Sequence, residues 1–285
     1  MKRLSLFLKK HWRNTVYSNV WISLGAAGLT LQTLYILDAV VWWIPVFVGF
    51  TTLFTYNFQR LVKLSERPEY IEAGRNNWLY RNRKELAILT LLSGSFSFFL
   101  FFRFHFQSML LLGISGIISL LYAVRLGKSE NREGKALRDL PYLKLYLIGL
   151  VWGLSTALLP LIEVDLFGPK LTWIVVERFC FIIAITIPFD IRDIALDSVR
   201  QRTLPQVIGI RPAKLVAYGW LAAALICSGV SHYLGFNHFY DLVGIALSYV
   251  VSAWLIFKSS PEQDEMYFTA LIDGVILLQV VLVLL

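Results

Sequence analysis

Charged residues are scarce in this chain of 285 residues, where they make up 16% of the sequence. An ordinary soluble domain has about a quarter, so this shortage excludes that class of protein. Hydrophobic residues account for 57% and aromatic residues for 15%, and the mean hydropathy is +0.62. The composition predicts an all-α, polytopic membrane protein, because long apolar runs cross a bilayer as helices.

Cysteine and histidine are also scarce, with two and four copies. Cys180 and Cys227 both fall inside apolar stretches, which is typical of small buried residues. They predict neither a disulfide framework nor a metal site. The histidines share no common spacing, so a histidine metal site is not expected either.

Apolar runs long enough to span a bilayer, which takes roughly 20 residues of helix, occur nine times. The predicted spans are 16–37, 40–61, 86–104, 106–126, 142–161, 171–196, 213–234, 238–257 and 267–285. They are expected to form one transmembrane domain over 1–285, built as two four-helix halves plus one helix. An amphipathic segment at 1–14 would lie on the cytoplasmic surface, and 65–84 and 127–141 would be cytoplasmic loops.

The basic residues are unevenly distributed between the two sides of this topology. If the N-terminus is cytoplasmic, then of the 27 Lys and Arg residues only Arg103 and Lys170 lie on the opposite side, and Arg178 lies within a span. This positive-inside pattern predicts a cytoplasmic N-terminus and a C-terminus on the opposite side. Basic loops facing an anionic leaflet explain the net charge of +8, so no nucleic-acid or protein partner is predicted.

Carboxylates at an ordered spacing occur at the end of the sixth predicted span. Asp190, Asp193 and Asp197 follow an i, i+3, i+7 pattern, which at roughly 100° per residue puts them on one helix face. Mg2+ prefers oxygen ligands and takes one or two carboxylates together with water and phosphate oxygens. The pattern therefore favours a metal-bridged diphosphate at a cytoplasmic site, although a solvated, self-paired helix end has the same spacing.

Polar and basic residues near other span ends could contact such a diphosphate, because guanidinium groups bind phosphate as bidentate donors. Asn57 and Arg60 lie three residues apart, as do Tyr122 and Arg125, so each pair shares one helix face. Arg192 and Arg200 lie close to the aspartates in the sequence. The candidate diphosphate contacts are Asn57, Arg60, Tyr122, Arg125, Arg192 and Arg200.

Glu177 and Arg178 fall inside the sixth predicted span, where unpaired charges are costly. Adjacent residues on a helix do not face one another, so we expect the partners of Glu177 and Arg178 on other helices.

The second and sixth predicted spans end in similar sequences, which are Tyr56-Asn57-Phe58-Gln59-Arg60 and Pro188-Phe189-Asp190-Ile191-Arg192. Such a repeat favours two related halves with a site between them.

These residues resemble the UbiA superfamily of intramembrane prenyltransferases. Its members have nine spans, Asp-rich motifs at the cytoplasmic ends of helices two and six, and a cavity that opens to lipid. Residues 190–197 are similar to the second motif, D-x-x-D-x-x-x-D. The family's first motif, N-D-x-x-D-x-x-x-D, is not kept in this chain. When its asparagine is aligned on Asn57, the three aspartate positions are occupied by Phe58, Leu61 and Ser65.

The resemblance implies a transferase that moves an isoprenyl group from a prenyl diphosphate to a lipid-soluble, aromatic or quinoid acceptor. It implies that Asp190, Asp193 and Asp197 hold Mg2+ on the diphosphate and act in catalysis. Two other functions stay open. One is a non-catalytic membrane protein that binds an isoprenoid or quinone-like lipid, and the other is a secondary transporter, which related helical halves also fit.

Overall fold

The computed structural model describes residues 2–39, 41–66, 74–124, 136–137, 140, 143–166, 168, 171–195 and 201–285. The regular structure in these residues is helical. The helices are α1 (Lys2–Tyr17), α2 (Val20–Ile36), α3 (Trp43–Glu66), α4 (Gly74–Arg81), α5 (Arg83–Phe101), α6 (Phe106–Ala123), α7 (Leu143–Gly153), the π-helical η3 (Leu154–Leu158), α8 (Leu159–Glu163), α9 (Thr172–Arg192), α10 (Leu204–Ile208), α11 (Ile210–Tyr233), α12 (Phe239–Lys258), the π-helical η6 (Tyr267–Ile272) and α13 (Gly274–Leu284).

The predicted all-α, multi-pass membrane architecture is confirmed. Within the described residues, the nine predicted spans correspond to α2, α3, α5, α6, α7 to α8, α9, α11, α12 and η6 to α13. Five of these segments are long and apolar enough to cross a membrane by length and composition alone: α5, α7 to α8, α11, α12 and η6 to α13. Two shorter apolar helices, Val20–Ile36 and Phe106–Tyr122, accompany them.

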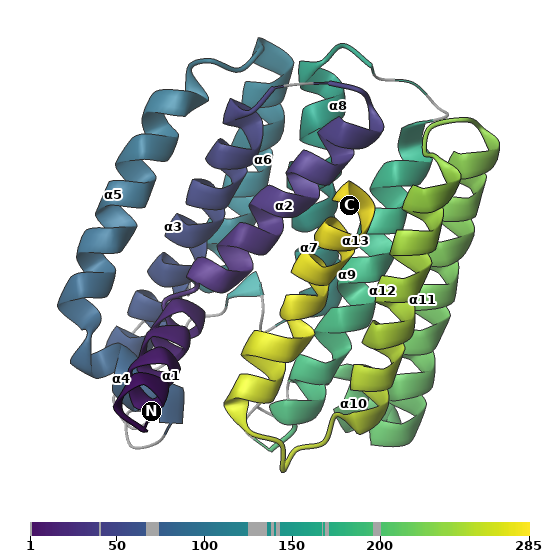
Figure 1. The fold of residues 1–285 in the computed structure, drawn as a ribbon. Helices are drawn as coiled ribbons and strands as arrows, with labels where there is room; N and C mark the ends of the chain where they lie inside the picture. Colours follow the sequence, from purple (N-terminus) through teal and green to yellow (C-terminus); the bar gives the residue numbers. More distant parts are fainter. Residues whose placement is uncertain are drawn as a thin grey trace.

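Two groups of long helices lie side by side in Figure 1, with α3, α5 and α6 in one and α9, α11 and α12 in the other. Helix α2 packs on α3 of the first group and on α13, which packs on α12 of the second group. Helix α7 packs on α9 and on α6, so α2, α13 and α7 join the two groups. Helix α9 is the central element: its residues from Phe181 to Pro188 are buried without interruption. A helix that is buried on all sides belongs inside a bundle, and α9 packs mainly on α11 and α7.

Several predicted boundaries differ from the structure, for example that of the second span, predicted as 40–61 but observed as Trp43–Glu66, and two other differences affect the candidate site. The first predicted span began at residue 16, but the chain breaks at Asn19, whose φ of 63° is left-handed, and α2 begins at Val20. The sixth was predicted to reach residue 196, but α9 ends at Arg192 and Asp193 is its C-cap. The second difference matters for the site, because Asp190 and Asp193 share only the last turn of the helix.

A charged group is buried inside the bundle, as the sequence predicted. The Tyr249 hydroxyl of α12 donates a hydrogen bond to Glu177, which confirms a partner on another helix. Arg178, however, has its Nε 3.5 Å from the Glu177 carboxylate, so the expectation that these neighbours make no contact was wrong. Long side chains can bend back toward an adjacent residue when burial removes water as the alternative partner.

The close contact between α12 and α13 depends on Gly244. A Cβ atom added there would lie 2.5 Å from the Leu282 carbonyl oxygen. We expect Gly244→Ala to lower the free energy of unfolding by about 1–3 kcal/mol, because the two helices must move apart. Thermal unfolding in lipid nanodiscs measures the change. Gly229→Ala in α11 is the matched control, since no atom lies within 4 Å of its added Cβ; equal unfolding temperatures for the two variants would contradict the prediction.

Candidate functional site

Asp190 lies in the last turn of α9 and is almost fully buried. Its Oδ1 atom is 2.7 Å from the Nζ atom of Lys144, the second residue of α7. The contact between α7 and α9 therefore holds a carboxylate and an ammonium group together at one end of the bundle. A buried carboxylate is stable in its charged form only with such a partner.

Asp193 follows one turn later and is held by its neighbour Arg192. The Arg192 Nε and Nη2 atoms donate to the two Asp193 carboxylate oxygens at 2.7 and 2.8 Å. The guanidinium also lies over the rings of Phe189 and Phe268, at 5.2 and 5.5 Å from their centroids. Burial alone would raise the pKa of Asp193, but the hydrogen bonds and charge of Arg192 outweigh burial and lower it.

Glu265, two residues before η6, joins this cluster although it was not selected from the sequence. Its Oε1 atom is 3.3 Å from Nη1 of Arg192 and 3.6 Å from Nη1 of Arg75. The segment that leads into η6 thus supplies a carboxylate to the cluster, whereas the first-motif positions Phe58 and Leu61 are apolar. The acidic run at 262–265 was the sequence signal that could have indicated this.

Arg75 is a second residue that sequence reasoning missed. It lies in α4, is buried, and donates from Nη2 to the Asn19 side chain at 2.7 Å and to the Tyr17 carbonyl oxygen at 3.2 Å. Burial, followed by the charge of nearby Arg60, lowers the pKa of Arg75 to about 9. Arg75, which lies inside the predicted loop 65–84, is therefore a buried member of the charged cluster that also contains Glu265 and Arg192.

Asn57 is buried in the same network. Its Oδ1 atom accepts a hydrogen bond from Asn19 at 2.8 Å, and its Nδ2 atom donates to the Ser18 carbonyl oxygen at 3.1 Å. Contacts run from Asn57 through Asn19, Arg75 and Glu265 to Arg192. In this arrangement the Asn57 amide is committed to protein partners and orients Arg75 through Asn19.

Of the remaining predicted contacts, the structure describes Arg60 and Tyr122. Arg60 and Tyr122 are half-buried near the ends of α3 and α6. At the first-motif positions, Phe58 stacks on Phe54 with ring centroids 5.9 Å apart, and Leu61 is half-buried. Residues Asp197, Arg125 and Arg200, also predicted for the site, lie outside the described residues.

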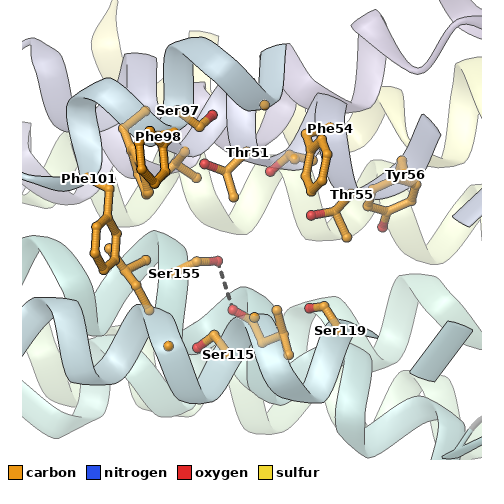
Figure 2. A pocket seen from close by; sticks show the side chains of 18 of the residues that line it. Thr51, Phe54, Thr55, Tyr56, Ser97, Phe98, Phe101, Ser115, Ser119 and Ser155 are labelled. Atoms are coloured by element: carbon orange, nitrogen blue, oxygen red, sulfur yellow. Dashed lines mark hydrogen bonds between the residues drawn. The ribbon is translucent and has the colours of Figure 1, made fainter. Parts of the chain in front are cut away.

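A cavity of about 510 Å³ lies between α3, α5, α6, α7 and η3 (Figure 2). Phenylalanine and hydroxyl side chains line it, and none of the described residues that line it is charged. Tyr56, the neighbour of Asn57, is part of its wall, and its hydroxyl oxygen accepts a hydrogen bond from Trp152 Nε1 at 3.3 Å. The charged cluster and the cavity therefore meet at the Tyr56 and Asn57 positions of α3.

Solved structures with this arrangement of helices are known. A UbiA homologue from Archaeoglobus fulgidus, bound to GPP and Mg2+, has a TM-score of 0.61 at 13% identity, covering 95% of this chain and 98% of that one. The chain has the UbiA fold. The same homologue bound to DMAPP and Mg2+ gives a TM-score of 0.57 at 13% identity, covering 95% and 97% of the two chains. A digeranylgeranylglyceryl phosphate synthase in membranes gives 0.51 at 15% identity, covering both chains fully.

Sequence comparison adds nothing to this likeness in structure, because no protein-family model and no curated protein sequence matches the chain. At identities of 13–15%, the UbiA fold is established by the arrangement of helices. The chemistry must be argued from the residues of this chain.

Proposed function

We propose that this protein is a UbiA-type prenyltransferase, which transfers an isoprenyl group from a prenyl diphosphate to a lipid-soluble, aromatic or quinoid acceptor. The observation that carries the proposal is the junction at Tyr56 and Asn57, where the charged cluster meets the uncharged cavity. A diphosphate needs the first environment and a prenyl group or lipid acceptor needs the second. In this proposal, the end that carries the cluster faces the cytoplasm.

Three cations of the cluster suit a diphosphate: Lys144, Arg75 and Arg192. Arg75 and Arg192 share the Glu265 carboxylate, so an incoming diphosphate competes with Glu265 for both. Guanidinium groups bind phosphate oxygens in pairs. As the C–O bond of the substrate breaks, negative charge grows on the leaving diphosphate, and cations already in position stabilise it without reorganising. The phenylalanine side chains that line the cavity would keep water from the prenyl carbon.

The GPP-bound Archaeoglobus homologue is also bound to Mg2+, and the residues of this chain fit one such ion only in part. Asp190 and Asp193 are oxygen donors one turn apart. Among the residues that the structure describes, however, no three His, Cys, Asp or Glu side chains are grouped so that they could hold a metal. The donor set therefore fits an ion that arrives with the diphosphate. When bound, the ion would supply Lewis-acid stabilisation of the leaving group.

A non-catalytic protein that binds an isoprenoid or quinone-like lipid is the second candidate. It is favoured by the apolar Phe58 and Leu61 at the first-motif positions and by the ion pairs that already engage Asp190 and Asp193. Such a protein would use the cavity without releasing pyrophosphate.

The test is pyrophosphate release by the protein in lipid nanodiscs, with geranyl or longer prenyl diphosphates and a panel of quinoid acceptors. We expect release to depend on the acceptor and to fall by about 100-fold or more when Mg2+ is chelated, because the leaving group loses its main counter-charge. Release that needs no metal would overturn the assignment of Asp190 and Asp193 as donors. Saturable lipid binding without any release would favour the non-catalytic candidate.

A further inference from the structure

Basic side chains gather on α1 and α4, which pack on each other at the end of the bundle where α10 also lies (Figure 1). Helix α1 has five basic residues and no acidic one. The exposed cations of α1, of α4 and of the first turn of α5 form what we call the basic surface: Lys9, Lys10, Arg13, Arg81, Arg83 and Lys84. No ion pair joins these side chains to another described residue, although Glu85 is exposed beside Lys84. The described part of the chain thus leaves this surface strongly positive.

The depth of the basic surface in the membrane follows from α5. Arg83 and Lys84 are exposed in its first turn, and Ile88 is an exposed apolar side chain of the same helix. From Lys84 to Ile88 the helix rises only about 6 Å, so the cations lie next to apolar surface that faces lipid. Trp12 and Tyr80 are exposed beside them, and tryptophan and tyrosine favour the membrane–water interface. The basic surface therefore lies at the level of the phospholipid headgroups.

Contacts between α1 and α4 also place Arg75, the buried cation of the charged cluster. The Trp78 Nε1 atom of α4 donates to the Asn14 Oδ1 atom of α1 at 3.1 Å, and the Trp78 ring meets the Tyr17 ring edge-on with centroids 5.7 Å apart. Arg75 itself donates to the Tyr17 carbonyl oxygen and pairs with Glu265. The exposed sides of the same two helices carry like charges, which repel one another. This repulsion loosens α4, and Arg75 with it, unless anions neutralise the basic surface.

We infer that the basic surface binds the headgroups of anionic phospholipids, and that this binding holds α4 on α1 and Arg75 in the charged cluster. Lys and Arg residues at the level of the headgroups are attracted to an anionic leaflet. A phosphate group shared by α1 and α4 replaces their mutual repulsion by attraction to one anion. The charge of the leaflet thereby regulates how firmly Arg75 is held. The inference goes beyond the proposed function, because it requires neither a prenyl diphosphate nor an acceptor.

Lipid binding is tested by native mass spectrometry of the protein from micelles that contain equal amounts of phosphatidylglycerol and phosphatidylcholine. We expect phosphatidylglycerol to be retained in excess. The double variant Lys10→Gln, Arg13→Gln removes two exposed cations of α1 and should lower the ratio of the two retained lipids on the order of tenfold. A ratio that is the same in the variant as in the unchanged protein would overturn the inference.

The effect on α4 is tested by hydrogen exchange of its backbone amides in nanodiscs with and without phosphatidylglycerol. In the unchanged protein these amides should exchange roughly fivefold more slowly in the anionic nanodiscs. This difference should disappear in Lys10→Gln, Arg13→Gln, and comparing variants cancels any effect of the leaflet on local pH.

The matched control for hydrogen exchange is Arg211→Gln, Lys258→Gln, which removes two exposed cations of α11 and α12 outside the basic surface. It should keep the lipid dependence of α4. Loss of that dependence in the control would indicate a general effect of protein charge and would overturn the inference, as would equal exchange of α4 in both lipids in the unchanged protein. Neither test uses pyrophosphate release, so a protein without transferase activity would contradict the proposed function and leave this inference standing.

Discussion

Asp190→Asn is expected to lower kcat/KM for pyrophosphate release by about 100- to 1,000-fold. The variant keeps the size of the side chain but removes a buried negative charge. In the unchanged protein, the Asp190 Oδ1 atom lies 2.7 Å from the Lys144 Nζ atom. Without that charge, Lys144 faces a neutral amide and the site loses an oxygen donor for the diphosphate-bound ion. Steady-state release with geranyl diphosphate and a quinoid acceptor measures the effect.

Two further variants distinguish a role in the site from a role in stability. Asp165→Asn is the matched control, since Asp165 is exposed and its φ of 56° is one that asparagine also adopts. It should leave release unchanged. The double variant Asp190→Asn, Lys144→Gln removes the unpaired ammonium group as well. Recovery of activity in the double variant would mean that the pair only stabilises the fold, whereas a site role predicts that activity stays low.

Glu177→Ala is expected to lower the free energy of unfolding by about 3–5 kcal/mol, the largest stability effect that we predict. The change leaves the fully buried Arg178 without its counter-charge and removes the hydrogen-bond acceptor of Tyr249. Inside a membrane the arginine has no water to replace them. Denaturant unfolding of the purified protein in mixed micelles measures the loss.

Tyr249→Phe is the matched comparison, because it removes the hydrogen bond to Glu177 but keeps the ring that stacks on Phe181. It should cost only about 1 kcal/mol. If Glu177→Ala costs no more than Tyr249→Phe, the Arg178 charge is balanced by groups other than Glu177, and the pairing argument fails.

Prediction from the sequence was most successful for features that depend on the residues of a single helix, such as the length of an apolar run or the spacing of side chains on one face. The number of membrane segments follows from the length of apolar runs, and Asp190 was recognised because its neighbours sit at helical spacing. It was weakest where a helix ends: the i, i+7 position of Asp197 assumed a helix that in fact stops at Arg192. Hydrophobicity does not mark such an end sharply, because the residues that follow, Ile194 and Ala195, are themselves apolar.

The contacts of the candidate site could not be predicted in the same way. Arg75 and Glu265 are separated by most of the chain, and neither has a local pattern that indicates burial. Asn57 was selected from its place at a helix end, and the structure surrounds its amide with Asn19 and Ser18. Its part in the network depends on the left-handed turn at Asn19, which boundary prediction missed.

The sequence by itself determined that this protein is an all-helical, multi-pass membrane protein, because apolar length and scarce charge leave a chain no other way to satisfy its backbone in lipid. It also indicated two carboxylates of the candidate site, Asp190 and Asp193. Only the tertiary structure decided that Lys144 pairs with Asp190, that Arg75 pairs with Glu265, and that a cavity lined by phenylalanine and hydroxyl side chains lies between α3, α5, α6, α7 and η3. These contacts join residues far apart in the chain, and helix packing, rather than local spacing, brings them together.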